Sequence, residues 1–368
     1  MASSGHHRPS RIAIVGSVGV PAKYGGFETL AEQLCRHVDP IVARLLVTCA
    51  KTSYPPDERS QLFHLHERHF LRFKANGWQS MVHDAWAILY MAMAGRCDGI
   101  LLLGVSGAWI LPLLRLIRPS FPIWVNIDGA EALRTKWGKV TSLLLRTLEA
   151  LAIRHSTRII ADNAEISGDL LRHYDVNPVV IAYGGDHIGY IECLHRTVPP
   201  DASRCFALSR IVPENNVEAI LAAFVGAPTT LVYVGNWDAS RYGADLQRRY
   251  AHYPNITLHP PIYDQDQLNR LRGSCSIYVH GHGVGGTNPS LVEAIFWASQ
   301  IYAFDCKYNR STMQGSGEYW STSGELRTLL TALSAPGGAT TDPAIALLRA
   351  RYAWTEIAAQ YIALWQAR

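Results

Sequence analysis

The sequence has few of the features that mark a secreted, membrane-spanning or disulfide-rich protein. Its seven cysteines are scattered singly with no CxxC pair, which argues against a disulfide framework or a zinc site and favours reduced thiols. The N-terminus MASSGHHRPSR has no apolar signal-peptide core. The longest apolar region, 85–114, is interrupted by GRCDG, and neither half reaches the ~18–20 residues of a spanning helix. We therefore expect a soluble, cytoplasmic protein, with peripheral contact to the inner face of the cytoplasmic membrane left open.

Charge is also scarce. Charged residues make up 17% of the chain against 48% hydrophobic residues, and the formal net charge is +4. This mild balance argues against a nucleic-acid binder, but it leaves room for a local basic patch facing phosphates or an anionic membrane surface. A length of 368 residues is enough for two domains, each with its own core.

Short β-branched runs alternate with helical patterns along almost the whole chain. The alternation occurs twice, which predicts an α/β protein with two Rossmann-like, doubly wound domains. In such sheets ligands bind beyond the carboxyl ends of the strands. The predicted strands lie at 11–16, 43–49, 99–104, 122–127, 157–161 and 178–182, and then at 204–209, 229–235, 255–259, 275–280 and 300–304.

The domain boundary is expected after IAYGGDHIGY, where CLHRTVPPDASR brings prolines and polar residues without periodicity. A last helix carries Trp354, Ile357, Tyr361 and Trp365 on one face, so it should dock on another part of the protein. We expect a flexible tail over 1–10, a first domain over 11–188, a second over 189–350, and a C-terminal helix over 351–368 that crosses back to the first domain.

Four loops follow predicted strands and could carry chemistry. The first, from Gly16 to Leu34, places Gly25 and Gly26 immediately before a helix, where free N–H groups favour an anion. The loop does not match GxGxxG, and a flexible connection explains it equally well.

The second loop, at 125–137, carries Asp128 and Glu131 just past a strand. A carboxylate there could bind a hydroxylated substrate or act as a base. The spacing alone favours a helix cap with a capping-box glutamate. The segment from Arg134 to Arg158 has six basic residues and only Glu149 as an acid. It could face anionic lipid head groups, although a solvated charged face is the commoner explanation.

The third loop, LSRIVPENN at 208–216, opens the second domain. Arg210 could form a bidentate contact with a diphosphate, and Asn215 or Asn216 could cap the next helix.

The fourth loop, in HGHGVGGTNPSLVEAIF at 280–296, is the most informative. Asn288 supplies an N-cap and the following proline stands at the first helical position. A helix that begins under a glycine-rich loop offers unpaired N–H groups to a diphosphate. Glu293, one turn in, could accept hydrogen bonds from a ribose diol. A capped structural helix does not explain why four glycines crowd together, at Gly281, Gly283, Gly285 and Gly286.

Other patterns are set aside. DQD at 264–266 reads as a helix cap. His64 and His66 would share one face of a strand, but no further metal ligands accompany them. No GxSxG elbow or Cys–His signature is present.

Together these loops resemble those of the retaining glycosyltransferases of family 4, and most closely a bacterial polysaccharide rhamnosyltransferase-like branch. The residues that carry the resemblance are GVPAKYGGFETLAEQL, VNIDGAE with RTKW, IAYGGDH, RIVPENN and HGHGVGGTNPSLVEAI. The resemblance implies a GT-B architecture, in which two Rossmann-like domains face each other across a cleft. The C-terminal domain would hold the nucleotide sugar and the N-terminal domain the acceptor.

The resemblance also implies residue roles. Catalytic residues would be Asp128, Arg210 and Glu293. The donor would be bound by Gly25, Gly26, Arg210, Asn215, Gly235, His259, Ile262, His282, Gly285, Gly286, Thr287, Asn288 and Glu293. The acceptor side would comprise Tyr24, Asp128, Glu131 and His187. This sequence departs from the family where Asn215 replaces a lysine and Gly285 a glutamate, and from the branch at Ala132 and Leu133.

The implied reaction is metal-independent transfer of a sugar with retention, with no cofactor beyond the donor and no nucleic acid. dTDP-L-rhamnose is the favoured donor, with GDP-mannose and UDP-hexoses left open. The acceptor would be a saccharide or lipid-diphosphate-linked saccharide in bacterial surface polysaccharide synthesis. A sugar-nucleotide epimerase and a non-catalytic nucleotide-sugar-binding scaffold are the alternatives.

Overall fold

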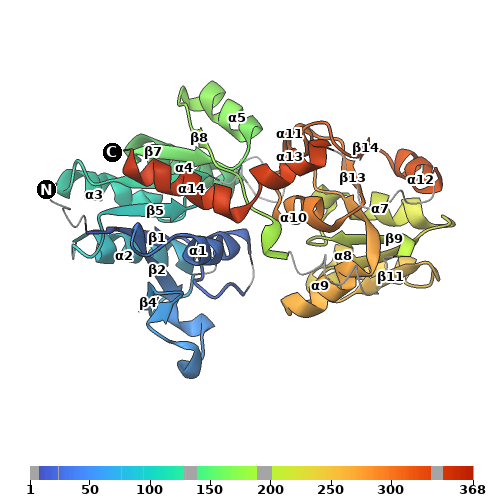
Figure 1. Ribbon diagram of the computed structural model, residues 1–368, viewed down its shortest axis with the longest axis horizontal. Coiled ribbons are helices and arrows are strands. Elements are labelled where there is room, and N and C mark those ends of the chain that lie inside the picture. The colour runs from blue at the N-terminus through green and yellow to red at the C-terminus, as the bar shows by residue number, and fades with distance from the viewer. Residues whose placement is uncertain are drawn as a thin grey trace, which may run out of the picture. The chain divides into compact units, whose positions relative to one another are not determined.

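The structure is a computed structural model of the chain. It describes residues 8–23, 25–75, 77–93, 95–127, 129, 139–188, 201–332 and 343–367. The chain forms two compact units (Figure 1). The first comprises Met1–Ala182 and Trp354–Arg368, and the second comprises Tyr183–Ala353.

The first unit is built on an eight-stranded sheet in the order β3-β4-β2-β1-β5-β6-β7-β8. Every neighbouring pair is parallel except β3 and β4. The strands are β1 Ser10–Val15, β2 Ala43–Ala50, β3 Leu62–Phe63, β4 His66–Leu71, β5 Gly99–Leu103, β6 Ile123–Ile127, β7 Arg158–Ala161 and β8 Val179–Val180. β5 and β6 are buried along their whole lengths, as expected for parallel strands covered on both faces.

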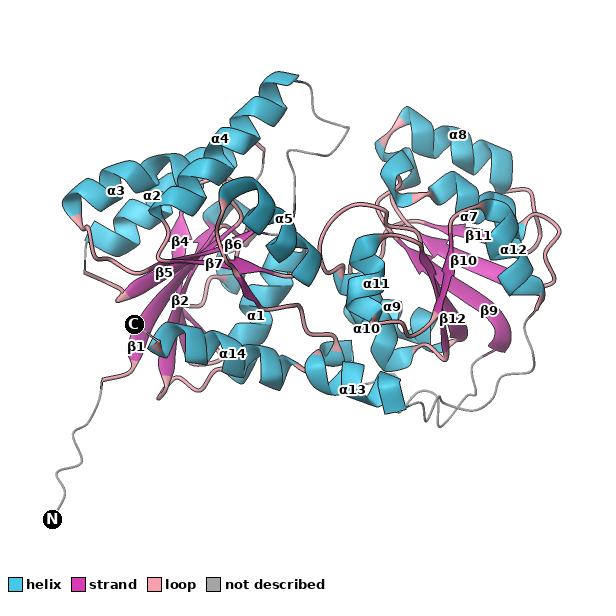
Figure 2. Ribbon diagram, turned by 90° about the horizontal axis from the view of Figure 1, so that it is seen from above, coloured by secondary structure: helices cyan, strands magenta, loops and turns pink. Residues whose placement is uncertain are grey.

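Helices cover both faces of this sheet. Figure 2 shows α2, α3 and α4 on one side, and α1 and α14 on the other. The helices are α1 Gly26–His37, α2 Gln79–Met93, α3 Leu111–Ile117, α4 Lys139–His155, α5 Ala164–Tyr174 and α14 Trp354–Gln366, with short 3-10 turns η1 Lys51–Ser53, η2 Pro56–Glu58 and η3 Ala108–Ile110.

Helix α14 belongs to the first unit although the chain reaches it last. Trp354, Tyr361 and Trp365 are buried, so the aromatic face read from the sequence packs inward. The side-chain amide of Asn126 in β6 donates a hydrogen bond of 3.0 Å to the Tyr361 hydroxyl. This bond connects the last helix to an interior strand of the sheet.

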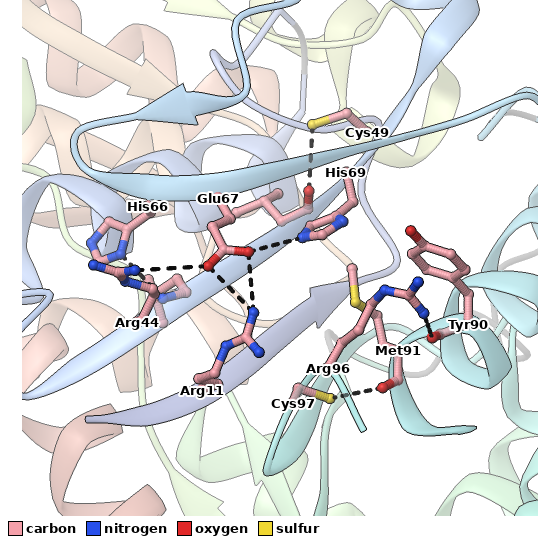
Figure 3. Close-up of polar contacts among 12 residues, drawn as sticks. Arg11, Arg44, Cys49, His66, Glu67, His69, Tyr90, Met91, Arg96 and Cys97 are labelled. Carbon is pink, nitrogen blue, oxygen red and sulfur yellow. Dashed lines mark hydrogen bonds and ion pairs between the residues drawn. The ribbon is translucent and has the colours of Figure 1, made fainter. Parts of the chain in front are cut away.

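A polar cluster lies near the amino ends of β1, β2 and β4. Glu67 accepts hydrogen bonds from Arg11 at 3.2 and 3.3 Å and contacts His69 at 3.3 Å and Arg44 at 3.9 Å (Figure 3). It lies away from the carboxyl ends of the strands, where sheets of this kind bind ligands. We therefore assign the cluster a structural role.

The expectation that His64 and His66 share one face of a strand is wrong. His64 and Leu65 both have positive φ and form the two-residue turn between β3 and β4. The Leu45 amide donates to His66 Nδ1, so Nε2 carries the proton and donates to the Val38 carbonyl. Among the described residues no group of three His, Cys, Asp or Glu side chains could hold a metal ion.

The second unit contains a six-stranded parallel sheet in the order β11-β10-β9-β12-β13-β14. The strands are β9 Asp201–Leu208, β10 Thr230–Val234, β11 Ile256–His259, β12 Cys275–His280, β13 Gln300–Phe304 and β14 Glu318–Trp320. The helical segments are η5 Asp186–Ile188, η6 Pro213–Asn215, α7 Val217–Phe224, η7 Trp237–Ala239, α8 Arg241–Tyr250, α9 Gln265–Gly273, α10 Pro289–Trp297, α11 Lys307–Met313, α12 Ser323–Thr331 and α13 Pro343–Arg351.

The strand order of the second sheet fixes where a ligand would bind. From β9 the chain builds outward through β10 and β11, then crosses to β12 on the other side of β9. The order therefore reverses between β9 and β12, and doubly wound sheets bind ligands beyond the carboxyl ends of the strands at such a point.

No helix among the described residues is long and apolar enough to span a bilayer.

Candidate functional site

The loops that follow β9 and β12 contact each other at the point where the strand order reverses. The Gly283 amide donates to the Glu214 carbonyl at 3.2 Å, and the Asn216 side-chain amide donates to the Gly281 carbonyl at 2.9 Å. These bonds join the segment around Arg210 to the glycine-rich loop. Both loops therefore form one structured rim.

Close packing explains two of the glycines on this rim. A Cβ on Gly281 would lie 2.2 Å from the Asn215 carbonyl oxygen, and a Cβ on Gly235 would lie 2.9 Å from the Ser209 carbonyl oxygen and 2.4 Å from Ile211. Neither position can hold a larger residue without moving its neighbours. Gly285 has a φ of 124°, which only glycine adopts readily.

Helix α10 begins at the end of the glycine-rich loop as the sequence predicts. Asn288 is the N-cap, with its side-chain oxygen accepting from the Ser290 amide at 3.1 Å and from the Ser290 hydroxyl at 2.7 Å. Among the described residues, the amides of Gly285 and Gly286 have no backbone acceptor. They can therefore donate to an anion, which the positive end of the α10 dipole also attracts.

Two histidines flank the start of this loop. The rings of His280 and His282 stack at 4.6 Å, and His280 Nδ1 lies 3.2 Å from the Tyr278 hydroxyl. Burial, followed by the neighbouring His282, lowers the pKa of His280 well below its usual value. His280 is therefore neutral at pH 7. Its ring packs on His282 and fixes the start of the glycine-rich loop.

Arg210 is the cation of the rim. Its side chain is exposed in the loop after β9, and no partner for its guanidinium is found in the described part of the chain. The buried Asn215 donates to the Arg210 carbonyl at 2.8 Å, which fixes the backbone from which this guanidinium projects. Asn216 stands at the N-cap of α7, but its side chain does not cap the helix.

His259 is the last residue of β11, the neighbour of β10, and Ile262 follows that strand. The His259 carbonyl accepts from the Gly235 amide at 3.1 Å and from Trp237 Nε1 at 3.0 Å. Those bonds hold the end of β11 beside the segment after β10. The carboxyl ends of four adjacent strands thus form one continuous edge.

Glu293 is buried on α10 and already has two strong partners. Arg272 from α9 hydrogen-bonds Glu293 Oε2, and His187 Nε2 from η5 lies 3.3 Å from Glu293 Oε1. Burial raises the pKa of Glu293, but Arg272 and His187 together lower it more, so the net shift is downward. The carboxylate is therefore ionised and held in a fixed position, and Arg272 is a partner that sequence reasoning did not identify.

The corresponding loop of the first unit is also held firmly, by two carboxylates of α1. Glu28 Oε1 accepts from the Val18 amide at 3.1 Å and Glu32 Oε2 accepts from the Ala22 amide at 2.6 Å. Burial raises the pKa of Glu28. Gly25 is the N-cap of α1 with a φ of 119°, and Gly26 is its first residue. In its described part, residues 16–23, the loop is therefore held to α1 and does not form a free connection.

A second feature of the first unit escaped sequence reasoning. Asp84, buried on α2, accepts a hydrogen bond from the Ser106 hydroxyl in the loop after β5 and lies 3.0 Å from His83 Nδ1. β5 and β1 flank the point where this sheet reverses its order. No spacing in the sequence signals that Ser106 meets Asp84.

The structure brings together part of the predicted site. Arg210, Asn215, Gly235, His259, Gly285 and Asn288 lie on the segments that form the rim of the second sheet, as do Ile262, His282, Gly286 and Thr287. His187 also lies in the second unit, against Glu293, because the boundary follows Ala182. The predicted residues that lie outside the described residues are Tyr24, Asp128, Glu131, Ala132 and Leu133.

Comparison with known families gives one match. Residues 10–186, which cover most of the first unit, match a family model described as "Domain of unknown function (DUF1972)". A search of curated proteins found no match to the sequence.

Several solved structures share the whole architecture. Sucrose-phosphate synthase from Thermosynechococcus elongatus has a TM-score of 0.77 at 16% identity, over 97% of this chain and 98% of that one. Anabaena HepE in complex with UDP and glucose has a TM-score of 0.71 at 14% identity, over 98% and 100%. The catalytic domain of starch synthase IV from Arabidopsis thaliana, bound to ADP and acarbose, has a TM-score of 0.69 at 11% identity, over 98% and 99%. At these identities the likeness shows the fold alone: the chain has the GT-B fold, with two doubly wound α/β units.

Proposed function

We propose that the protein is a retaining glycosyltransferase that takes a sugar from a nucleotide diphosphate. The observation that carries the proposal is the rim of the second sheet. It combines an exposed arginine, glycine amides and a capped helix start at the point where the strand order reverses. This combination fits a diphosphate because each part binds negative charge. None of these groups is a nucleophile, so the rim is suited to binding the diphosphate and not to forming a covalent bond with the sugar.

In the proposed mechanism the rim stabilises the departing diphosphate. Negative charge grows on the phosphate oxygens as the bond to the sugar breaks, and Arg210 with the Gly285 and Gly286 amides would bind it more strongly as it grows. A phosphate oxygen of the leaving group takes the acceptor proton on the same face of the sugar, which gives retention. Asp128 is proposed to face the acceptor hydroxyl.

Glu293 is proposed to contact the nucleotide ribose from a fixed carboxylate. Both of its oxygens already have protein partners, and each oxygen has a further lone pair for a ribose hydroxyl. Arg272 and His187 would then act as positioning residues for this contact. This arrangement replaces the acceptor-side role first expected for His187.

For the donor we propose dTDP-L-rhamnose, on the strength of the sequence resemblance, with UDP-hexoses and GDP-mannose as the competing donors. The structures similar to this chain include complexes with UDP and with ADP, so the base is the least constrained part of the proposal. The proposed acceptor is a saccharide or lipid-diphosphate-linked saccharide in bacterial surface polysaccharide synthesis. A lipid-linked acceptor would require peripheral contact with a membrane.

Calorimetric titration with dTDP, UDP and GDP and with their sugar conjugates tests the donor site. One nucleotide should bind selectively, and Arg210→Ala should weaken that binding by about tenfold to a hundredfold, because a charge-assisted hydrogen bond contributes ~1.5–3 kcal/mol. Arg270→Ala is the matched control, since Arg270 is also exposed but lies in the last turn of α9, which leads into the amino end of β12 and not into its carboxyl end.

Turnover then separates the transferase from its alternatives. Donor consumed only with an acceptor supports the transferase, whereas an isomerised donor without acceptor would identify an epimerase. Donor binding without turnover on any acceptor would identify a scaffold. No nucleotide binding at all would refute the site.

A further inference from the structure

We propose that the first unit docks on an anionic phospholipid bilayer through the face formed by α2, η3–α3 and α4. We call this the α2–α3–α4 face. The bilayer would be the membrane partner of the proposed transferase. The evidence for it is the exposure and charge of side chains on this face and does not depend on the proposed activity.

Helix α2 is apolar on its outer side, whereas its inner side buries His83 and Asp84 among apolar residues. Its inner side packs on the sheet, while its outer side exposes Val82, Trp86 and Met93, with Trp78 just before its first turn. These positions follow a spacing of four, four and seven, so they form one stripe along the helix. A helix of a globular protein normally has polar residues on this outer side.

The segment η3–α3 continues the apolar surface. Leu113, Leu116 and Ile117 are exposed on α3, and Trp109 of η3 is half-exposed. Trp109 Nε1 donates to the Met81 carbonyl at 3.1 Å, so the only polar atom of its side chain is satisfied and its ring is left outward. η3 contacts both α2 and α4, so the exposed apolar residues of α2 and α3 are continuous with those of α4.

The first two turns of α4 add Val140, Leu143 and Leu144, all exposed. Figure 2 shows α2, α3 and α4 on the same side of the sheet. Eleven of the 21 exposed large hydrophobic side chains found among the described residues lie between Trp78 and Leu144, whereas the second unit has three. The exposure is therefore concentrated on one face, which is typical of an interaction surface.

The charges of this face fit an anionic surface. Its helices carry two carboxylates, Asp84 and Glu149. Asp84 is buried, and Glu149 is half-buried against Tyr174. The cations Arg146 and Arg154 are exposed on α4, while Arg115 of α3 is half-buried and its guanidinium donates to backbone carbonyls. Exposed apolar side chains beside arginines, with no exposed carboxylate on these helices, are the composition that binds the interface of an anionic bilayer.

The same charges argue against a second copy of the chain. A symmetric dimer through this face would bring the two sets of arginines together with no carboxylate to pair them. The exposed tryptophans favour the head-group level of a bilayer, where an amphipathic ring is stable.

The test is flotation of the full-length protein with phosphatidylcholine vesicles, with and without phosphatidylglycerol. We expect binding only to the anionic vesicles. The triple variant Trp78→Ser, Leu116→Ser, Leu143→Ser should weaken it by at least about tenfold, because it removes apolar contact with the bilayer. Arg146→Gln and Arg154→Gln should each weaken it by about fivefold at low salt.

The matched control is Ile41→Ser, Leu65→Ser, Leu347→Ser. Its three residues are 68–81% exposed, against 67–81% in the test variant, and all lie off the α2–α3–α4 face. The control should bind like the unaltered protein. No binding to anionic vesicles, or equal loss in both variants, overturns the proposal. So does a lipid-free dimer, seen by analytical ultracentrifugation, that the test variant dissociates.

Vesicle binding needs no turnover, so the two proposals fail independently. We expect the test variant to bind nucleotide as the unaltered protein does. A protein that binds vesicles but no nucleotide refutes the donor site and leaves the docking face standing, and the reverse result does the opposite.

Discussion

At the residue scale, the closest approach on the rim of the second sheet is at Gly281, where no side chain fits against the Asn215 carbonyl. Gly281→Ala should lower the free energy of unfolding by about 1–3 kcal/mol, because the added methyl group forces the two loops apart. Nucleotide binding should weaken with it. Urea unfolding and calorimetric titration measure the two effects.

Gly324→Ala is the control for this change. Gly324 lies in the first turn of α12 in the same unit, and a Cβ there would have its nearest neighbour at 3.9 Å. The free energy of unfolding of the Gly324→Ala variant should stay the same or rise slightly, since alanine restricts the unfolded chain. A Gly281→Ala variant as stable as this control would contradict the close packing described for the rim.

The pair of Arg272 and Glu293 gives a second prediction at this scale. Arg272→Met leaves a buried carboxylate whose one remaining side-chain partner among the described residues is His187, so the free energy of unfolding should fall by about 3–5 kcal/mol. Adding Glu293→Leu should cost less than the sum of the two single changes, because the second change removes the stranded charge. Chemical denaturation of the unaltered protein, the two single variants and the double variant measures the coupling energy between the two residues.

An exposed ion pair supplies the comparison. Arg248→Met breaks the contact with Asp245 on the surface of α8 and should not change stability measurably. Additive effects at Arg272 and Glu293 would show that the buried pair does not act as a unit.

Some of these residues can be predicted from the sequence and others cannot, because only some of their contacts are local in the sequence. Asn288 and Asp264 were predicted as helix caps and are confirmed, because a cap bonds to residues only two or three positions away. Arg272, which lies 21 residues from Glu293, and Asp84, which lies 22 residues from Ser106, meet their partners only through the fold. No local spacing encodes such a meeting.

At the element scale, the strands of the interior were the most predictable. β12 and β13 have the predicted bounds, because interior strands that are mostly buried carry a largely apolar run of residues. The edges of the sheets were not. The predicted strand at 178–182 reduces to β8 Val179–Val180, and the edge strand β14 was missed, because a short edge strand buries too little to leave a pattern.

Helix α14 gives the prediction for this scale. Tyr361→Phe removes the acceptor of the Asn126 amide and leaves that donor buried, which should cost about 1–3 kcal/mol of unfolding free energy. Urea unfolding followed by circular dichroism measures it. Tyr90→Phe in the same unit is the control, because no hydrogen bond from its hydroxyl is found among the described residues and its ring contact with Arg96 is retained. Equal stability of the two variants would mean that α14 is held by its apolar face alone.

At the scale of the whole molecule, three buried or half-buried histidines contribute to the pH dependence of folding. Burial lowers the pKa of His66, His69 and His280, so near pH 6.5 the unfolded chain binds protons that the folded chain does not. Stability rises with pH wherever the unfolded state binds more protons. The contribution of these histidines is therefore complete above about pH 6.5 and is lost as the pH falls below it.

The measurement is the urea midpoint at about pH 7.5 and about pH 5.5, for the protein and for His280→Phe. The midpoint should fall with pH in both, and less in the variant, which has one buried histidine fewer. An unchanged slope in the variant would show that His280 does not contribute to this dependence.

The division of the chain between the units has a consequence for synthesis on the ribosome. Residues 183–353 form a unit from one uninterrupted stretch, so this part can fold as soon as it has emerged. The first unit needs residues 354–368 as well, and its bond between Asn126 and Tyr361 spans 235 positions of sequence. Such a long-range closure is slow and must wait for the second unit to be translated. The unit whose strands are made first is therefore completed last.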